Sequence, residues 1–229
     1  GGGDRGVAGD KAGAVRGARG PGTLFGGVAT AGPTTLGIVE GSGAVAEGGA
    51  ESGTWFHVDG AYGGAGLAAP TVRHLFAGIE HADSFIVDPH KWLFAPFDCC
   101  ALLYREPALA RAAHTQKASY LDVLTDAPEW NPSDYSVGLT RRARGLPLWF
   151  SLATHGTAAY TAAIERTLAV TRFAEAEIAR RPYLEALREA DLSGLVFRRL
   201  GWKPEDYHAW SAGMRREGFA VGVPTSHEG

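Results

Sequence analysis

The sequence predicts an α/β domain built on a largely parallel sheet. Short apolar runs rich in β-branched and aromatic residues are typical of strands, and we expect strands at residues 24–29, 55–58, 84–87 and 101–104. The segments between the first three runs are long enough to cross over, which favours parallel pairing. Ligands of such sheets bind at the carboxyl ends of strands. Thr30, Asp59 and Lys91 all follow or close an expected strand.

The connecting segments have their own patterns. Residues 1–22 hold nine glycines among charges and small side chains, so we expect a mobile lead-in. Residues 70–79 have apolar positions at helical spacing, and residues 113–136, with prolines and several Asp and Asn, predict a loop. A helix is expected over 141–152, and a longer one from 157 to about 190 with a break near Pro182.

The C-terminal part predicts a small α+β unit. A strand is expected at 195–199 and another at 219–223. Between them a helix begins at Pro204 and stops at Gly218. We therefore divide the chain into the lead-in 1–22, a large domain at 23–155 and a small domain at 156–229.

Composition excludes several classes of protein. A net charge of −3 over 229 residues does not favour nucleic acid or an anionic membrane as a partner. No uncharged apolar run reaches the length of a spanning helix, and no secretory signal is visible. The adjacent Cys99 and Cys100 lack the spacing of a zinc site and are expected to be reduced core residues, so we expect no metal and a cytoplasmic location.

Two residues carry the chemistry of the predicted site. Lys91 follows the apolar run 84–87, where we expect poor solvation, and a desolvated lysine loses its proton more readily and can form a Schiff base. Asp59 ends the preceding strand and can hold a proton on a pyridine nitrogen. Alone, Asp59 could cap a turn and Lys91 could be a surface lysine at a helix start. Together they match the requirements of pyridoxal phosphate (PLP).

The sequence around Asp59 and Lys91 resembles that of the group II PLP-dependent amino-acid decarboxylases, the family of aromatic-amino-acid, tyrosine and glutamate decarboxylases. The matching segments are His-Val-Asp-Gly-Ala-Tyr-Gly-Gly at 57–64, Asp-Pro-His-Lys-Trp at 88–92 and Phe-Asp-Cys-Cys-Ala at 97–101. The resemblance implies PLP-dependent transferase fold type I, the aspartate aminotransferase-like fold, followed by part of a small α+β domain. It also implies that an N-terminal portion and the extreme C-terminus of the family are absent.

The resemblance also implies roles for individual residues. Lys91 would carry PLP, Asp59 would face its ring nitrogen, and Ala61 would pack on the ring. His90 would touch cofactor or substrate, and Tyr120, on a mobile loop, would return a proton to Cα. Thr30 and Asp88 match further positions near the cofactor, and Asp88 is expected close to its phosphate. Arg141 and Arg142 are expected to form ion pairs of the scaffold.

The predicted function is decarboxylation of an L-amino acid, with aromatic substrates preferred, in a homodimer of the full-length form. One alternative is a non-catalytic remnant, because the family's phosphate-binding Gly/Ser loop and ring-stacking aromatic residue belong to the absent portion. A second alternative is another fold type I enzyme, a transaminase or a desulfurase. Tyr120 and the sequence around Asp59 and Lys91 favour a decarboxylase over a transaminase or a desulfurase.

Overall fold

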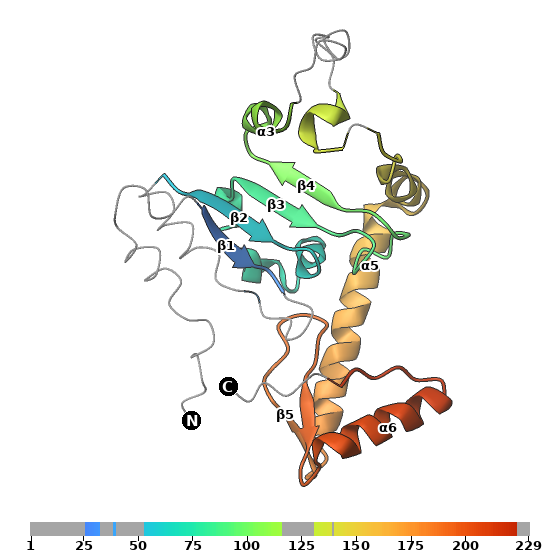
Figure 1. Cartoon of the computed structure of the whole chain (residues 1–229). Coiled ribbons are helices and arrows are strands. Elements are labelled where there is room, and N and C mark those ends of the chain that lie inside the picture. Colours follow the sequence, from blue (N-terminus) through green and yellow to red (C-terminus); the bar gives the residue numbers. More distant parts are fainter. Residues whose placement is uncertain (1–25, 33–38, 40–52, 116–130, 139, 224–229) are drawn as a thin grey trace.

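A mixed four-stranded sheet forms the centre of the protein, in a computed structural model that describes residues 26–32, 39, 53–115, 131–138 and 140–223. The strands lie in the order β1 (Gly26–Thr30), β2 (Trp55–Asp59), β3 (Ser84–Val87) and β4 (Ala101–Tyr104) (Figure 1). The first three are parallel, and β4 runs antiparallel to β3. The predicted α/β class with a mostly parallel sheet is confirmed.

The predicted strand positions agree closely with the structure. β3 and β4 have the expected bounds, β2 is one residue longer and β1 begins and ends slightly later. Along β2 burial alternates, with Phe56 and Val58 buried and their neighbours half-buried. This period of two is the pattern by which a strand is recognised in sequence.

The expected helix over 70–79 does not form, and this prediction was wrong. The chain instead makes two short 3-10 turns, η2 (Arg73–Phe76) and η3 (Ile79–His81), which follow a first such turn, η1 (Gly63–Ala68). Val72 and Phe76, four residues apart, still bury their side chains, so the apolar spacing is used without a continuous helix. Gly78, with φ of 96°, stops any helical continuation.

A polar corner follows β4. Helix α3 (Pro107–His114) begins with Glu106 capping the Ala108 amide, and the short turn η4 (Pro132–Tyr135) packs beside it. Arg111 of α3 donates to the buried carboxylate of Asp134 at 2.9 Å. This pair ties the two ends of the predicted loop together.

Helix α5 (Gly145–Ala179) is the longest element and contains a kink at Gly156, where φ is 74° and ψ is 161°. The two helices predicted at 141–152 and from 157 both lie in this element; the first begins four residues later than predicted, and the kink falls in the gap predicted between them. Helix α5 also ends well before residue 190, because Pro182 follows its last turn and Leu184–Ala186 form strand β5. Figure 1 shows α5 running from the sheet to the C-terminal unit.

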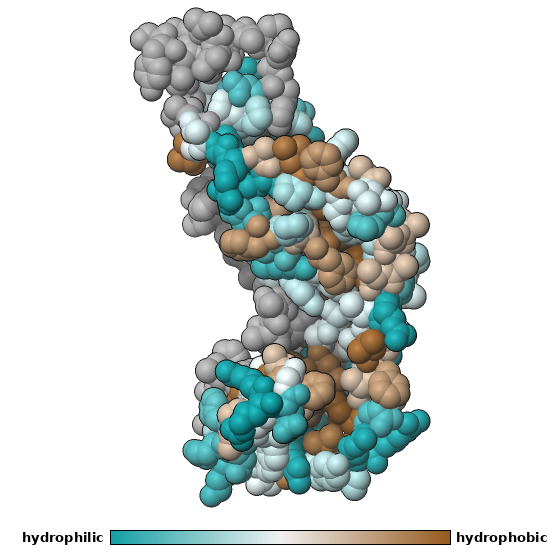
Figure 2. Space-filling model, turned by 90° about the vertical axis from the view of Figure 1, so that its right-hand side faces the viewer, coloured by the Kyte–Doolittle hydropathy of each residue, from teal (hydrophilic) through white to brown (hydrophobic). Residues whose placement is uncertain are grey.

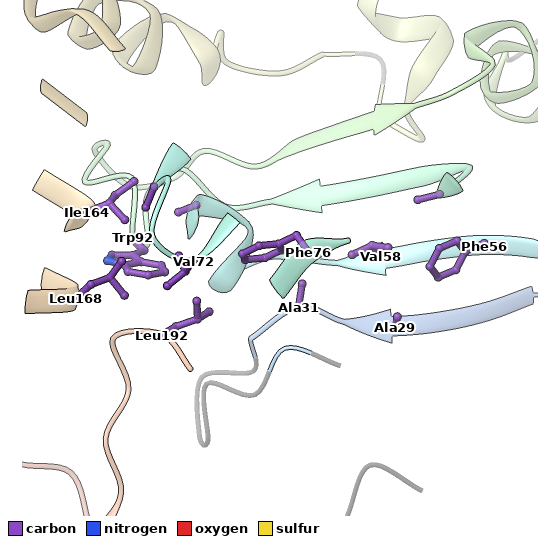
Figure 3. Packing of buried hydrophobic residues seen from close by; sticks show 13 residues of the cluster. Ala29, Ala31, Phe56, Val58, Val72, Phe76, Trp92, Ile164, Leu168 and Leu192 are labelled. Carbon is purple, nitrogen blue, oxygen red and sulfur yellow. The ribbon is translucent and has the colours of Figure 1, made fainter. Parts of the chain in front are cut away.

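One apolar cluster lies between the sheet, the 3-10 turns and α5 (Figure 3). Val58 from β2 and Phe76 from η2 are buried in it, and Ile164 and Leu168 of α5 close it from the side. Leu192, far along the chain, is fully buried in the same cluster. The carboxyl ends of β1 and β2 are thus supported by a packed core.

The C-terminal unit consists of the antiparallel pair β5 (Leu184–Ala186) and β6 (Phe197–Arg199) with helix α6 (Pro204–Arg216). The predicted helix at Pro204 is confirmed. The predicted strand at 219–223 is wrong, because that segment is irregular. Its Val221 carbonyl accepts a hydrogen bond from the buried Ser211 hydroxyl instead of a strand partner.

None of the helices in the described part of the chain is long and apolar enough to cross a membrane. The predicted boundary between residues 155 and 156 coincides with the kink in α5 and stays a prediction. The predicted lead-in 1–22 lies outside the described residues.

Candidate cofactor site at the carboxyl edge of the sheet

Thr30 and Asp59 are the last residues of β1 and β2 and lie directly opposite each other in the parallel register. Ala29 and Val58, one position earlier, are fully buried on the core face. Because side chains alternate along a strand, Thr30 and Asp59 share the opposite face. The structure therefore brings these two predicted site residues together at the carboxyl edge.

A short hydrogen-bonded chain connects the Asp59 motif to the Lys91 motif. The Asp59 carboxylate accepts the Ala61 amide at 3.0 Å through Oδ1. The Ala61 carbonyl in turn accepts the Asp88 amide at 3.0 Å. Residues that are distant in sequence are thereby fixed relative to each other by backbone groups.

Gly63 allows the turn after Asp59 to lie against the end of β1. A Cβ at this position would lie 2.2 Å from the Ala31 carbonyl oxygen and 2.8 Å from the Gly32 Cα, both backbone atoms. No side-chain rearrangement could relieve such contacts. Within the Gly-Ala-Tyr-Gly-Gly motif, Gly63 is therefore required for the close approach of two backbone segments.

Trp92 anchors the segment that carries Lys91. Its ring is 4% exposed, stacks on Tyr62 with a centroid distance of 5.3 Å, and belongs to the core cluster. Figure 3 shows it beside Ile164 and Leu168 of α5. Its Nε1 donates to the Thr167 hydroxyl of the same helix at 2.9 Å.

Lys91 itself is less buried than the sequence predicts. Its side chain is 35% exposed, and its Nζ lies 3.0 Å from the Asp88 carboxylate. The expectation of a desolvated lysine was wrong, because the end of β3 is only half-buried and the turn from Asp88 leaves the Lys91 side chain partly exposed. The contact with Asp88 was missed by sequence reasoning, although an acid three residues before a lysine in a turn is a usable signal.

Asp88 is surrounded by hydrogen-bond donors. Burial opposes its ionisation, but hydrogen bonds from Lys91 and Cys100, together with the nearby charges of Lys91 and His90, hold the pKa of Asp88 below its usual value. Desolvation of the Cys100 thiol, its hydrogen bond to Asp88 and the charge of Asp88 raise the pKa of Cys100 to about 11, although the residue as a whole is exposed. At neutral pH Asp88 is therefore a carboxylate and Cys100 an un-ionised thiol.

His90 is held by the segment after it. Its Nδ1 lies 2.6 Å from the Cys99 carbonyl oxygen and 3.2 Å from the Cys99 amide nitrogen, and the Phe97 ring packs edge-on against it. A proton on Nδ1 satisfies the shorter contact, which leaves the lone pair on Nε2. Because Cys99 is buried, the backbone that orients His90 is itself fixed.

Two arginines hold the same segment from the start of α5. Asp98 accepts from Arg142 at 2.6 Å and from Arg144 at 2.9 Å. The Arg144 hydrogen bond, partly opposed by burial, holds the pKa of Asp98 below its usual value. The predicted ion-pairing role is confirmed for Arg142, whereas Arg141 donates to the carbonyls of Pro132 and Gly138.

Tyr120 lies outside the described residues, and its predicted role stays a prediction.

Among the residues that the structure describes, no cluster of three or more His, Cys, Asp and Glu side chains could hold a metal ion. Cys99 and Cys100 are both free thiols; Cys99 is buried as predicted, whereas Cys100 is exposed, so its prediction as a core residue was wrong.

The side chains at this edge fit PLP by their chemistry. Asp59 offers a carboxylate for the ring nitrogen, Lys91 an amine for the aldehyde, and Thr30 and His90 further polar groups. An α/β fold with an acid at one strand end and a lysine after the next defines the class of fold type I PLP proteins.

The family follows from comparison with known proteins. Residues 14–200 match the pyridoxal-dependent decarboxylase conserved domain, and the chain belongs to this family. A tryptophan decarboxylase of Camptotheca acuminata is 33% identical over 175 residues, which are 74% of this chain and 34% of that protein. The cysteine sulfinic acid decarboxylase of Mus musculus is 36% identical over 177 residues, covering 74% of this chain and 35% of that protein.

Solved structures show the same fold. A mouse CSAD structure in apo form has a TM-score of 0.81 at 27% identity and covers 96% of this chain and 49% of that one. The Oryza sativa TDC structure with PLP and tryptamine has a TM-score of 0.78 at 28% identity and covers 87% and 43%, respectively. The chain thus spans about a third of the curated relatives' length and about half of the mouse structure.

Proposed function

We propose that the protein acts as a PLP-dependent decarboxylase that converts an L-amino acid to its amine and CO2. The observation that carries the proposal is the pairing of Thr30 with Asp59 at the sheet edge, connected through Ala61 to the turn of Lys91. PLP, when bound, supplies an electron sink for the charge that develops at the substrate Cα.

The residues of this chain would divide the work. Lys91 would hold the cofactor covalently and give way to the substrate amine. Asp59 would keep a proton on the ring nitrogen, and His90, held by Cys99, would orient the ring or the substrate carboxylate. Tyr120 would deliver a proton to Cα after CO2 leaves. A Tyr120→Phe variant that releases amine at the normal rate would remove Tyr120 from this step.

The family membership supports decarboxylation over the transaminase and desulfurase alternatives. A non-catalytic role for the chain is the other alternative, and turnover assays distinguish it directly. As substrate we propose an aromatic amino acid, supported by the similarity to tryptophan decarboxylases. Other relatives are named for acidic substrates, so aromatic and acidic amino acids need to be compared as substrates. Amine release from tryptophan, cysteine sulfinate and glutamate, measured in parallel, tests this choice.

The covalent attachment of the cofactor is the sharpest test. The protein is incubated with PLP, reduced with borohydride and digested, and the pyridoxyl label is located by mass spectrometry. We expect the label on the peptide that contains Lys91. Label on Lys203, which is exposed at the start of α6, would show non-specific reaction and contradict the proposal.

We also propose a homodimer and a cytoplasmic location. Large apolar side chains are exposed on the first turns of α5, where Leu146, Trp149 and Phe150 are each at least half exposed. Figure 2 shows apolar residues gathered on the face that lies on the right of Figure 1. Burial of such a patch against a second copy would favour association. Sedimentation of the purified protein tests the dimer, and fractionation of cells tests the location.

A further inference from the structure

Asp88 is fixed at three points, two of which involve Lys91. Its amide donates to the Ala61 carbonyl at 3.0 Å, its carbonyl accepts the Lys91 amide at 2.9 Å, and its carboxylate contacts the Lys91 Nζ at 3.0 Å. The Asp88 side chain is only 15% exposed, whereas that of Lys91 is 35% exposed. The better-buried partner therefore holds the more exposed one.

Cys100 supplies a second donor to the same carboxylate. Desolvation of the Cys100 thiol and its interaction with the Asp88 carboxylate raise the pKa of Cys100 to about 11. The thiol is accordingly protonated at neutral pH and acts as a donor rather than as a nucleophile. The adjacent Cys99 is buried, which fixes the backbone from which Cys100 reaches Asp88.

We propose that Asp88 is a positioning residue for Lys91. The Asp88 carboxylate holds the Lys91 ammonium group at the sheet edge, and Cys100 is the second donor to that carboxylate. The inference rests on the proposed function, in which Lys91 carries the cofactor. A nitrogen that attacks an aldehyde needs its lone pair, so the ion pair must open before Lys91 reacts. Asp88 thereby determines both the position of the Lys91 Nζ and its reactivity as a nucleophile.

The test measures the reactivity of Lys91 without added cofactor. The full chain is labelled with a trace of acetic anhydride at pH 8, and acetylation of Lys91 is compared by mass spectrometry with that of Lys203, an internal reference in the C-terminal unit. Asp88→Asn should raise the Lys91 to Lys203 ratio about threefold, the size expected when a partly exposed ion pair is removed. Asp88→Glu keeps the charge and should stay near the wild-type ratio.

A matched control uses the other acid of the segment. Asp98 pairs with Arg142 and Arg144 rather than with Lys91, so Asp98→Asn should leave the Lys91 ratio unchanged. Alkylation of Cys100 by iodoacetamide gives a second readout, which Asp88→Asn should accelerate because the thiol loses a neighbouring negative charge. Circular dichroism confirms that the variants are folded.

An unchanged Lys91 ratio in Asp88→Asn overturns the inference, as does an equal rise in Asp88→Glu. Because no cofactor takes part, this outcome is separate from failure of the proposed function, which would appear as borohydride label away from Lys91. The inference stands when Asp88→Asn alone changes both Lys91 acetylation and Cys100 alkylation.

Discussion

The sheet region and the C-terminal unit of β5, β6 and α6 are held together in different ways. The sheet region packs fully buried apolar side chains such as Val58 and Phe76 between strands, turns and α5. In the C-terminal unit, half-buried rings pack edge-on around Trp202 and Trp210, and Arg199 lies 4.8 Å from the Trp202 ring centroid. Core burial fixes backbone positions more firmly than partly solvated contacts do, and the candidate site lies on the sheet region.

The largest effect expected from this difference is on stability. Phe76→Ala should lower the free energy of unfolding by about 3–5 kcal/mol, because Phe76 is 2% exposed within a packed cluster. Phe197→Ala, the same change at a half-buried ring of β6, should cost about half as much. Urea unfolding of both variants measures the contrast. Equal losses would break the comparison between the two regions.

Activity should also depend much more on an aspartate of the sheet region than on an aspartate of the C-terminal unit. In protein that turns over substrate, Asp59→Asn should reduce the rate about a hundredfold, or roughly 3 kcal/mol, because a neutral side chain no longer holds the ring proton. The control is Asp206→Asn in α6, where the carboxylate only accepts the Lys203 amide at 2.8 Å. It should leave the steady-state rate within a factor of two. An Asp59→Asn rate close to wild type would remove Asp59 from the mechanism.

Glycine-to-alanine changes should have opposite signs in the two regions. Gly63→Ala should destabilise the protein by about 2 kcal/mol, because its Cβ would meet backbone atoms of residues 31 and 32. Gly213→Ala, inside α6 with only the Arg216 side chain 3.8 Å from its Cβ, should stabilise by about 0.5–1 kcal/mol. Thermal melting resolves both shifts. Loss of stability in both variants would show that α6 is packed more tightly than the contacts indicate.

The smallest effect concerns Tyr207. Its hydroxyl accepts the Arg199 amide at 3.0 Å and donates to the Arg199 carbonyl at 3.1 Å, which ties α6 to β6. Tyr207→Phe should cost about 1 kcal/mol and increase proteolysis near α6 while leaving cofactor capture by Lys91 intact. Hydrogen exchange of the α6 amides provides the measurement. A simultaneous loss of cofactor capture would show that the C-terminal unit supports the site more directly.

The sequence by itself located the strands of the central sheet and predicted which residues form the candidate site. Alternating burial needs only local apolar pattern, so β2, β3 and β4 were located within a residue. Asp59 and Lys91 were predicted as site residues because the carboxyl ends of strands in a parallel sheet meet at one edge. Pro204 likewise marks the start of α6, since proline favours the first turn of a helix.

Only the tertiary structure decided the features that depend on distant partners. The apolar spacing of 70–79 is compatible with a helix, but the single short turn η2, with Val72 at its N-cap, is enough to pack Val72 and Phe76 against the cluster. Leu184–Ala186 continue a helical composition but pair with β6 instead. Lys91 follows the apolar, half-buried strand β3, and its exposure and its contact with Asp88 are set by the turn after Val87 and by the docking of Trp92 on α5. Local pattern specifies which residues are buried, whereas the direction of a side chain after a strand end depends on contacts between segments far apart in the chain.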